Sequence, residues 1–297
     1  MLTLSKFKRK GAAAMSELCY YEGKFMPASE CRIPVTDMLI QRGVGTFESV
    51  RIYDGKLMGL TPHLERFANS VKSAGIDLEA LGGIKKIEEI IRLGVARDDC
   101  PKNGMVKPYA TGGDINEPKG VFPKPRFFAI FAPVLAAKTQ DEIENGAALL
   151  PNKMLRPNPL VKSINYLFGL IPLGQSDHSY FESVYVTPQG EFTEGMTSNF
   201  YLVKGGKIIT APVGKVLKGV TREIILTLAR ENGFEVEERC PLEGELAEAS
   251  EAFITGSIKE VLSIVRVGDV KIGDGRPGVV AKKIQELYTQ NRSRWLE

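Results

Sequence analysis

The stretch Val161-Lys162-Ser163-Ile164-Asn165-Tyr166-Leu167 places one lysine among apolar, amide and aromatic side chains. A lysine in such surroundings loses hydration, which lowers the pKa of its amine and frees it for Schiff-base chemistry. Taken alone, the stretch is more typical of a lysine on a helix surface, whose alkyl stem covers apolar neighbours while its ammonium reaches water. The choice between the two interpretations depends on the segments that follow along the chain.

Two later segments combine glycine with polar side chains. In Phe192-Thr193-Glu194-Gly195-Met196-Thr197-Ser198-Asn199-Phe200, a carboxylate precedes a glycine turn and the start of a strand. The second segment, Val216-Leu217-Lys218-Gly219-Val220-Thr221-Arg222, leads into an expected helix. Free N–H groups at a helix start, together with a threonine hydroxyl, suit an anion such as phosphate. Separately, the two segments could equally be an ordinary loop and an ordinary helix start.

In this order and at these distances, the three segments resemble those of the fold-type IV pyridoxal-phosphate enzymes. This family comprises branched-chain aminotransferases, D-amino-acid aminotransferases and aminodeoxychorismate lyases. The resemblance extends over nearly everything from about Cys31 to Tyr288, and its further motifs lie at 42–51, 62–67, 253–257 and 273–278. It implies a two-domain α+β fold like that of D-amino-acid aminotransferase, with a small α/β lobe and a larger α+β lobe.

The chain is expected to divide into a short extension and two domains. We predict a flexible N-terminal extension over 1–15, a small domain over 16–137, a connection over 138–145 and a large cofactor-binding domain over 146–297. The connection is predicted because its residues are polar and short of apolar side chains. The extension is basic and lacks the apolar segment of a secretory signal, and Met15 is an alternative start to Met1.

Hydrophobic spacing and turn residues predict the main elements. Thr61-Pro62 is expected to begin a helix that ends at Gly75, with Thr61 as its N-cap. Further helices are expected over 84–95, 162–173, 221–232 and 278–288. Strands are expected over 49–53, 126–133, 183–187, 199–203, 207–210 and 252–255.

Composition excludes several classes of protein. The chain has 297 residues, 43% of them hydrophobic, and a net charge of +3, which is too small and dispersed for a nucleic-acid binder. The longest apolar run, Phe127 to Ala137, is too short to span a membrane. The four cysteines are widely spread and only two histidines occur, so we expect no metal site and a reducing, cytoplasmic location.

The resemblance assigns roles to individual residues. Lys162 would form the Schiff base with pyridoxal 5'-phosphate and then move a proton between the substrate Cα and the cofactor. Glu194 would pair with the pyridine nitrogen and keep the ring cationic, so that the ring can accept electrons. Arg66 would bind the phosphate. The remaining residues implied for the cofactor site contact its ring, its phenolic oxygen or its phosphate: Tyr166, Leu217, Val220, Thr221 and Ser257.

The sequence leaves several related reactions as alternatives. We expect Phe47 and Lys107 to contact the substrate, although many relatives have arginine where this chain has Lys107. No histidine stands between His63 and His178, whereas the D-amino-acid enzymes use one there to bind the substrate carboxylate.

The block 47–51, Asn165-Tyr166 and the stretch 273–278 resemble the branched-chain type, which favours a transaminase acting on a branched-chain or other apolar L-amino acid and a 2-oxo acid. The alternatives are an aminodeoxychorismate lyase, which the segment Gly256-Ser257-Ile258-Lys259 keeps open, a D-amino-acid transaminase, and a catalytically silent phosphate-binding or scaffold protein. The resemblance also implies a homodimer.

Overall fold

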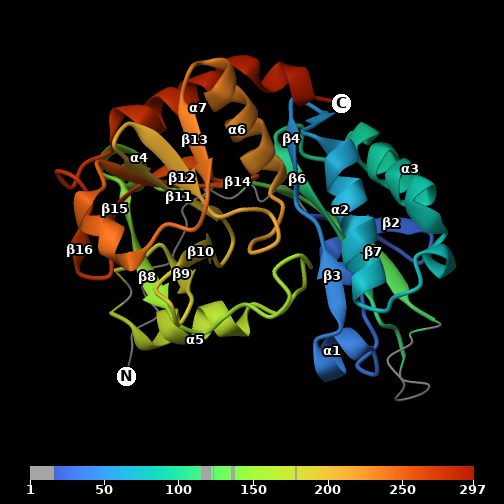
Figure 1. The fold of residues 1–297 in the computed structure, drawn as a ribbon. Coiled ribbons are helices and arrows are strands. Elements are labelled where there is room, and N and C mark those ends of the chain that lie inside the picture. The colour runs from blue at the N-terminus through green and yellow to red at the C-terminus, as the bar shows by residue number, and fades with distance from the viewer. Residues whose placement is uncertain (1–16, 115–121, 123, 135–137, 178) are drawn as a thin grey trace.

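A computed structural model describes residues 17–114, 122, 124–134, 138–177 and 179–297. These residues form two β-sheets, each with its own helices (Figure 1). The predicted extension over 1–15 lies outside the described residues, as does His178. In the described part of the chain, no helix is long and apolar enough to cross a membrane.

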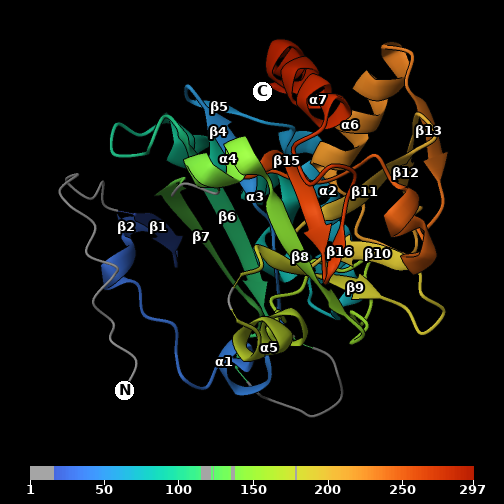
Figure 2. The same cartoon turned by 90° about the vertical axis from the view of Figure 1, so that its left-hand side faces the viewer.

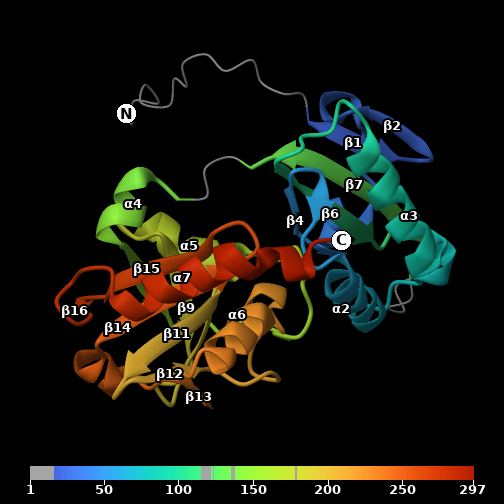
Figure 3. The same cartoon turned by 90° about the horizontal axis from the view of Figure 1, so that it is seen from above.

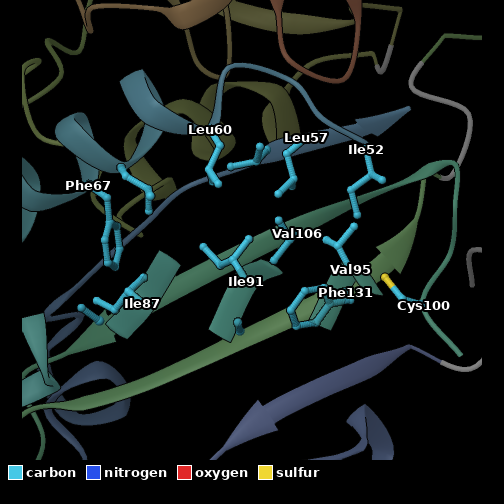
Figure 4. Close-up of a cluster of buried hydrophobic side chains, with 14 of the residues drawn as sticks. Ile52, Leu57, Leu60, Phe67, Ile87, Ile91, Val95, Cys100, Val106 and Phe131 are labelled. Atoms are coloured by element: carbon cyan, nitrogen blue, oxygen red, sulfur yellow. The ribbon is translucent and has the colours of Figure 1, made fainter. Parts of the chain in front are cut away.

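The first half of the described chain forms a seven-stranded sheet of order β2-β1-β7-β6-β4-β5, with β3 also paired to β6. Its strands are β1 (Leu18–Tyr21), β2 (Lys24–Pro27), β3 (Gly45–Phe47), β4 (Val50–Tyr53), β5 (Lys56–Leu57), β6 (Gly104–Thr111) and β7 (Arg126–Pro133). Helices α2 (Leu60–Ser73) and α3 (Gly83–Ala96) pack on one face, and Figure 4 shows Phe67, Ile91 and Phe131 in the core between them and the sheet. The short α1 (Met38–Arg42) precedes β3.

The second half forms a nine-stranded sheet of order β10-β9-β8-β15-β14-β11-β12-β13, with β16 paired to β15. Its strands are β8 (Ala147–Asn152), β9 (Glu182–Val186), β10 (Phe192–Gly195), β11 (Asn199–Lys204), β12 (Lys207–Thr210), β13 (Glu235–Glu238), β14 (Glu251–Gly256), β15 (Glu260–Val267) and β16 (Val270–Lys271). Helices α6 (Val220–Glu231) and α7 (Val279–Asn291) cover one face, as the view from above shows (Figure 3).

Direct contacts join the two halves. Glu297 and Leu57 exchange backbone hydrogen bonds of 2.8 and 2.9 Å, so the C-terminal end of the chain pairs with β5. Tyr53 on β4 donates a 2.6 Å hydrogen bond to Glu260 at the start of β15. Residues 162–164 pair with β3, where Phe47 N donates to Lys162 O and Ile164 N donates to Gly45 O. The segment that carries Lys162 is therefore held against the first sheet.

Most of the expected elements are confirmed, including the helices over 84–95 and 221–232 and the strand over 126–133. The helix expected over 162–173 is wrong at its start, because α5 covers Leu167–Gln175 and the preceding residues pair with β3 instead. The helix after β5 has Gly59, not Thr61, as its N-cap residue, and the Glu297 carboxylate accepts the N–H of Thr61.

Residues 138–145 were expected to be a bare connection, but Gln140–Asn145 form helix α4. Thr139 and Glu142 build a capping box at its start, so hydrogen bonding rather than apolar periodicity defines this helix. Figure 2 shows α4 beside β15, and Lys138 donates to the carbonyl of Val261 on that strand. The domain boundaries themselves stay a prediction.

The central strand β6 is absent from the sequence predictions, and it contains Pro108, a residue that is rare in the interior of a sheet. The N–H and C=O of one residue in an antiparallel strand point to the same side. Pro108 O accepts from Glu48 N, in the gap between β3 and β4, so the missing N–H faces a break in the neighbouring strand. This arrangement tolerates the proline and leaves Lys107 and Tyr109 on the face opposite Val106.

Candidate active site

Two adjoining cavities meet at Lys162. The inner cavity is lined by Arg66 from the first half of the chain and by residues of the second half that include Glu194 and Thr221. The outer cavity has a volume of about 510 Å³ and is lined by residues of both halves, among them Lys107 and Lys259. Lys162 and Tyr166 belong to both, so the cavities form one continuous site.

The ten residues predicted from the sequence all line this site. Those assigned to the cofactor surround the inner cavity: Arg66, Lys162, Tyr166, Glu194, Leu217, Val220, Thr221 and Ser257. The two assigned to the substrate, Phe47 and Lys107, line the outer cavity. The structure thus gathers positions that are up to 210 residues apart in sequence, from Phe47 to Ser257.

Lys162 is held by its backbone and left free at its amine. Its N–H donates to Ser70 Oγ (3.1 Å) and its carbonyl accepts from Phe47 N (3.0 Å). The Nζ atom lies 4.7 Å from the centre of the Phe47 ring and makes no hydrogen bond or ion pair with any described residue. Burial, aided by the nearby positive charge of Arg66, lowers the pKa of Lys162 to about 7. Near neutral pH, much of this amine is therefore uncharged and nucleophilic.

Glu194 forms the end of the inner cavity on β10. Its carboxylate accepts 3.0 Å hydrogen bonds from Arg156 Nη1 and from the backbone N–H of Leu217. Burial raises the pKa of Glu194, and the Arg156 guanidinium and the Leu217 N–H oppose that rise. A cationic ring nitrogen placed against this carboxylate would compensate its lost hydration further.

The start of α6 provides an anion site in the same cavity. The first hydrogen bond within this helix runs from Glu223 N to Gly219 O, so the N–H groups of Val220 and Thr221 precede the helical ladder. No side chain among the described residues caps the helix. A Cβ on Gly219 would lie 2.1 Å from Asn199 Oδ1, so this close approach of the helix start to β11 requires glycine.

Arg66 lines the same cavity as this helix start, and Glu48 holds its guanidinium in place. Its Nε and Nη2 donate to the two oxygens of Glu48 (2.8 and 2.7 Å), and its Nη1 donates to Lys218 O (2.6 Å). Although burial opposes it, Arg66 together with His63 lowers the pKa of Glu48 below its usual range. The carboxylate therefore stays charged and orients the guanidinium. Its Nη2 also lies 3.3 Å from His63 Nδ1, and the second N–H of Nη1 is available for an anion.

Three important side chains of this site were missed by sequence reasoning. Arg156 pairs with Glu194, Glu48 orients Arg66, and Asn199 donates to Leu217 O (3.1 Å) beside the helix start. Glu48 lies between Phe47 and Ser49, which both face the outer cavity, so strand alternation could have placed it on the opposite side, toward the helices. Arg156 lies in an irregular loop, where no periodic signal marks it.

Most of the chain matches proteins of known class. The family described as "Amino-transferase class IV" matches residues 45–267. A protein named "Putative branched-chain-amino-acid aminotransferase" from Methanocaldococcus jannaschii is 30% identical over 283 residues, which cover 93% of this chain and 96% of that protein. A D-alanine aminotransferase from Bacillus licheniformis is 32% identical over 271 residues, which cover 89% and 93% respectively.

A solved structure agrees with these matches. The branched-chain amino acid aminotransferase from Thermobaculum terrenum, in its PLP form, superposes with a TM-score of 0.78 over 95% of this chain and 98% of that one, at 21% identity. The protein therefore belongs to the class IV aminotransferases and has their fold-type IV architecture. The family, fold class and enzyme class predicted from the sequence are confirmed, and the alternative of a catalytically silent binding protein is not supported.

The depressed pKa of Lys162 can be tested without any cofactor. We predict that acetylation of Lys162 by a trace of acetic anhydride speeds up as the pH rises through about 7 and then levels off, because only the neutral amine reacts. Peptide mass spectrometry across a pH series measures this for every lysine at once. Exposed Lys215, which is paired with Glu191, is the internal control and should still be gaining reactivity above pH 10. Parallel pH profiles for both lysines would contradict the prediction.

Proposed function

We propose that this protein is a pyridoxal 5'-phosphate-dependent transaminase that moves an amino group between an amino acid and a 2-oxo acid. One observation carries the proposal. A single cavity combines a buried lysine amine of lowered pKa with a buried carboxylate and with an anion site at a helix start. Those are the three groups that a phosphorylated, cationic, aldehyde-bearing ring requires.

The residues present fit this cofactor. Arg66, the N–H groups of Val220 and Thr221, and the Ser257 hydroxyl would hold the phosphate, while Leu217 would cover one face of the ring and Tyr166 would bind its phenolic oxygen. When bound, the cofactor supplies an electron-accepting ring that stabilises negative charge at the substrate Cα.

Two residues would then control the protons of the reaction. Lys162 would provide the amine to which the cofactor aldehyde attaches. Its pKa of about 7 would also let it accept a proton from Cα and return one at working pH. Glu194 would hold a proton on the ring nitrogen.

We propose a branched-chain or other apolar L-amino acid as the donor. The name of the Methanocaldococcus relative and the aromatic side chains of the outer cavity support it. Phe47 and Tyr109 stack at 5.5 Å with an angle of 16° between their rings, both line the outer cavity, and the Phe47 ring lies against the Lys162 amine. The D-alanine aminotransferase relatives make a D-amino acid the second candidate.

A donor panel tests the proposed function. Purified holoenzyme would be given 2-oxoglutarate with L-leucine, L-isoleucine or D-alanine, and glutamate formation would be followed by chromatography. Separately, pyruvate release from aminodeoxychorismate would be measured. We expect amino transfer from at least one L-donor, with none from Lys162→Ala. Transfer from D-alanine alone would replace the proposed donor, and pyruvate release without transfer would identify a lyase.

Glu194→Gln tests the role of the carboxylate. The amide keeps the shape and a hydrogen bond but removes the charge, so the cofactor should still bind and still react with the amino group of the donor. Removal of the Cα proton should slow at least about tenfold, which corresponds to roughly 1.4 kcal/mol of lost stabilisation. Single-turnover kinetics with an α-deuterated donor measures this step. Full activity with an unchanged isotope effect would show that Glu194 has no part in it.

We also propose a homodimer. Helix α5 turns an apolar side outward, because Leu167, Leu170 and Ile171 lie at i, i+3 and i+4, and 61% of Leu167 and 50% of Leu170 are exposed. Leu155 and Leu160 in the preceding loop are also half exposed. Apolar groups gathered in this way are typical of a contact surface, and the fold-type IV resemblance implies a second copy of this chain as the partner.

Leu170→Asp tests the dimer surface. A buried charge at the contact should shift the population toward monomer, while a monomer with half-exposed Leu170 would tolerate it. Sedimentation velocity at several concentrations measures the mass. Val270→Asp, at a partly exposed apolar position on β16, is the control and should leave the mass unchanged. A wild-type protein that sediments as a monomer throughout would end the proposal.

The compartment is a further proposal. All four cysteines are free thiols, and Cys19, Cys100 and Cys240 are buried. Free thiols persist in a reducing environment. We therefore propose that the protein works in the cytoplasm.

A further inference from the structure

Apart from the Schiff-base candidate, two more lysines line the outer cavity. Lys107 projects from β6 of the first sheet, and Lys259 comes from the second half of the chain. Among the described residues that line this cavity, Glu182 is the one carboxylate. The cavity is therefore built to attract anions, and its two additional ammonium groups are carried by different sheets.

Lys259 stands at the tip of a short, rigid hairpin. Strands β14 and β15 end their pairing at Gly256 and Glu260, which leaves Ser257, Ile258 and Lys259 as the loop. Glu260 has a φ of 53°, the left-handed conformation that closes a three-residue hairpin loop. Its carboxylate is held by Tyr53 (2.6 Å) and Gln285 (2.7 Å). The loop that carries Lys259 is thus fixed to both halves of the molecule.

The Lys259 ammonium is held in place but not saturated. It donates to Glu182 Oε1 (3.0 Å) and to Thr197 Oγ1 (2.6 Å), and it lies 5.0 Å from the centre of the Phe181 ring. A lysine ammonium has three N–H donors. Two are used by these partners, which leaves the third without a hydrogen-bonding partner among the described residues, on a side chain that lines the outer cavity.

Glu182 accepts hydrogen bonds from Thr197 and Ser198 as well as from Lys259. It is buried on β9 and accepts from the Thr197 N–H (2.9 Å) and hydroxyl (2.8 Å) and from the Ser198 hydroxyl. Although burial opposes it, Lys259 and these donors lower the pKa of Glu182. Replacing a buried ion pair with apolar side chains of similar size is often neutral or stabilising, so stability alone is a weak reason for this pair.

Lys107, on β6 of the first sheet, lines the outer cavity as well but is not held as Lys259 is. It makes no hydrogen bond or ion pair with any described residue, and it shares its face of β6 with Tyr109. Ser49, near it on the same wall, has a hydroxyl without a partner among the described residues. A ligand that spans the cavity would meet an ammonium at each side.

We propose that Lys259, held by Glu182, is a specificity-determining residue that binds a carboxylate of the substrate, so that the outer cavity favours substrates with two carboxylates over those with one. The inference rests on the proposed transaminase function and concerns one of its two substrates, the amino acid or the 2-oxo acid. The other substrate can still be apolar, because the two bind in turn to the same cavity.

A matched pair of inert ligands tests this without turnover. Glutarate and valerate have five carbons each and differ in the second carboxylate. Their binding to the holoenzyme is measured by isothermal titration calorimetry. We expect glutarate to bind the wild type at least about tenfold more tightly than valerate, the scale of one charge-assisted hydrogen bond. In Lys259→Met this ratio should fall close to one, since valerate can still use Lys107.

Two further variants separate specificity from folding. Lys259→Met leaves Glu182 buried without its cation, so Glu182→Gln/Lys259→Met removes both charges and should show the same loss of ratio in a folded protein. Lys138→Met is the control, because Lys138 bonds the Val261 carbonyl and lines neither cavity, and it should keep the wild-type ratio.

The outcomes of the two proposals are distinguishable. Equal binding of the two ligands by the wild type, or an unchanged ratio in both Lys259 variants, would overturn the inference even if the enzyme transfers amino groups. A ratio that depends on Lys259 in a protein that transfers no amino group would overturn the proposed function instead and leave the carboxylate site standing.

Discussion

The arrangement of the site depends on burying one amine without a counter-ion. Lys162 has no hydrogen-bonding partner at Nζ among the described residues, and the guanidinium of Arg66 adds positive charge nearby. A charged ammonium would be costly there, so the fold favours the neutral form. Its stability falls as the pH drops from the ordinary lysine pKa of 10.5 to the folded-state pKa of about 7, and it then levels off. Because most of this cost is already present near neutral pH, the surrounding backbone must hold the segment firmly. It does so through Ser70 and the pairing with Phe47.

The same backbone pairing explains why the site lies between the sheets. Residues 162–164 belong to the second half of the chain but pair with β3 of the first, so Lys162 faces both cavities. Figures 1 and 2 show α1 and α5, the helices that flank this junction in sequence, at the same end of the molecule. The start of α6 and Glu194 on β10 come from the second half of the chain, whereas Arg66 reaches across from α2. The inner cavity is therefore complete only when both halves are in place.

The sequence predicted best those parts of the structure that a local pattern defines, either a hydrophobic period or a known order of motifs. Periodicity located α3, α6 and β7, and the order of motifs located the residues that line the inner cavity. It failed where tertiary contacts override local signals. The helix expected over 162–173 loses its first turn to pairing with β3, and β6 tolerates Pro108 because its neighbour is interrupted there. Arg156 and Lys259 could not be assigned, because their partners are remote in sequence: Glu194 lies 38 residues from Arg156 and Glu182 lies 77 from Lys259.

The three lysines of the outer cavity show how surroundings give one side chain different uses. Lys162 has an aromatic ring and no carboxylate at its amine, so it is suited to act as a nucleophile and base. Lys259 is bound to a buried carboxylate and a hydroxyl, which keep an ammonium in place as a fixed donor. Lys107 has neither, and it can follow a ligand's position with its flexible stem. The three side chains therefore differ in what the protein places at each amine: an aromatic ring at Lys162, Glu182 and Thr197 at Lys259, and no hydrogen-bonding partner among the described residues at Lys107.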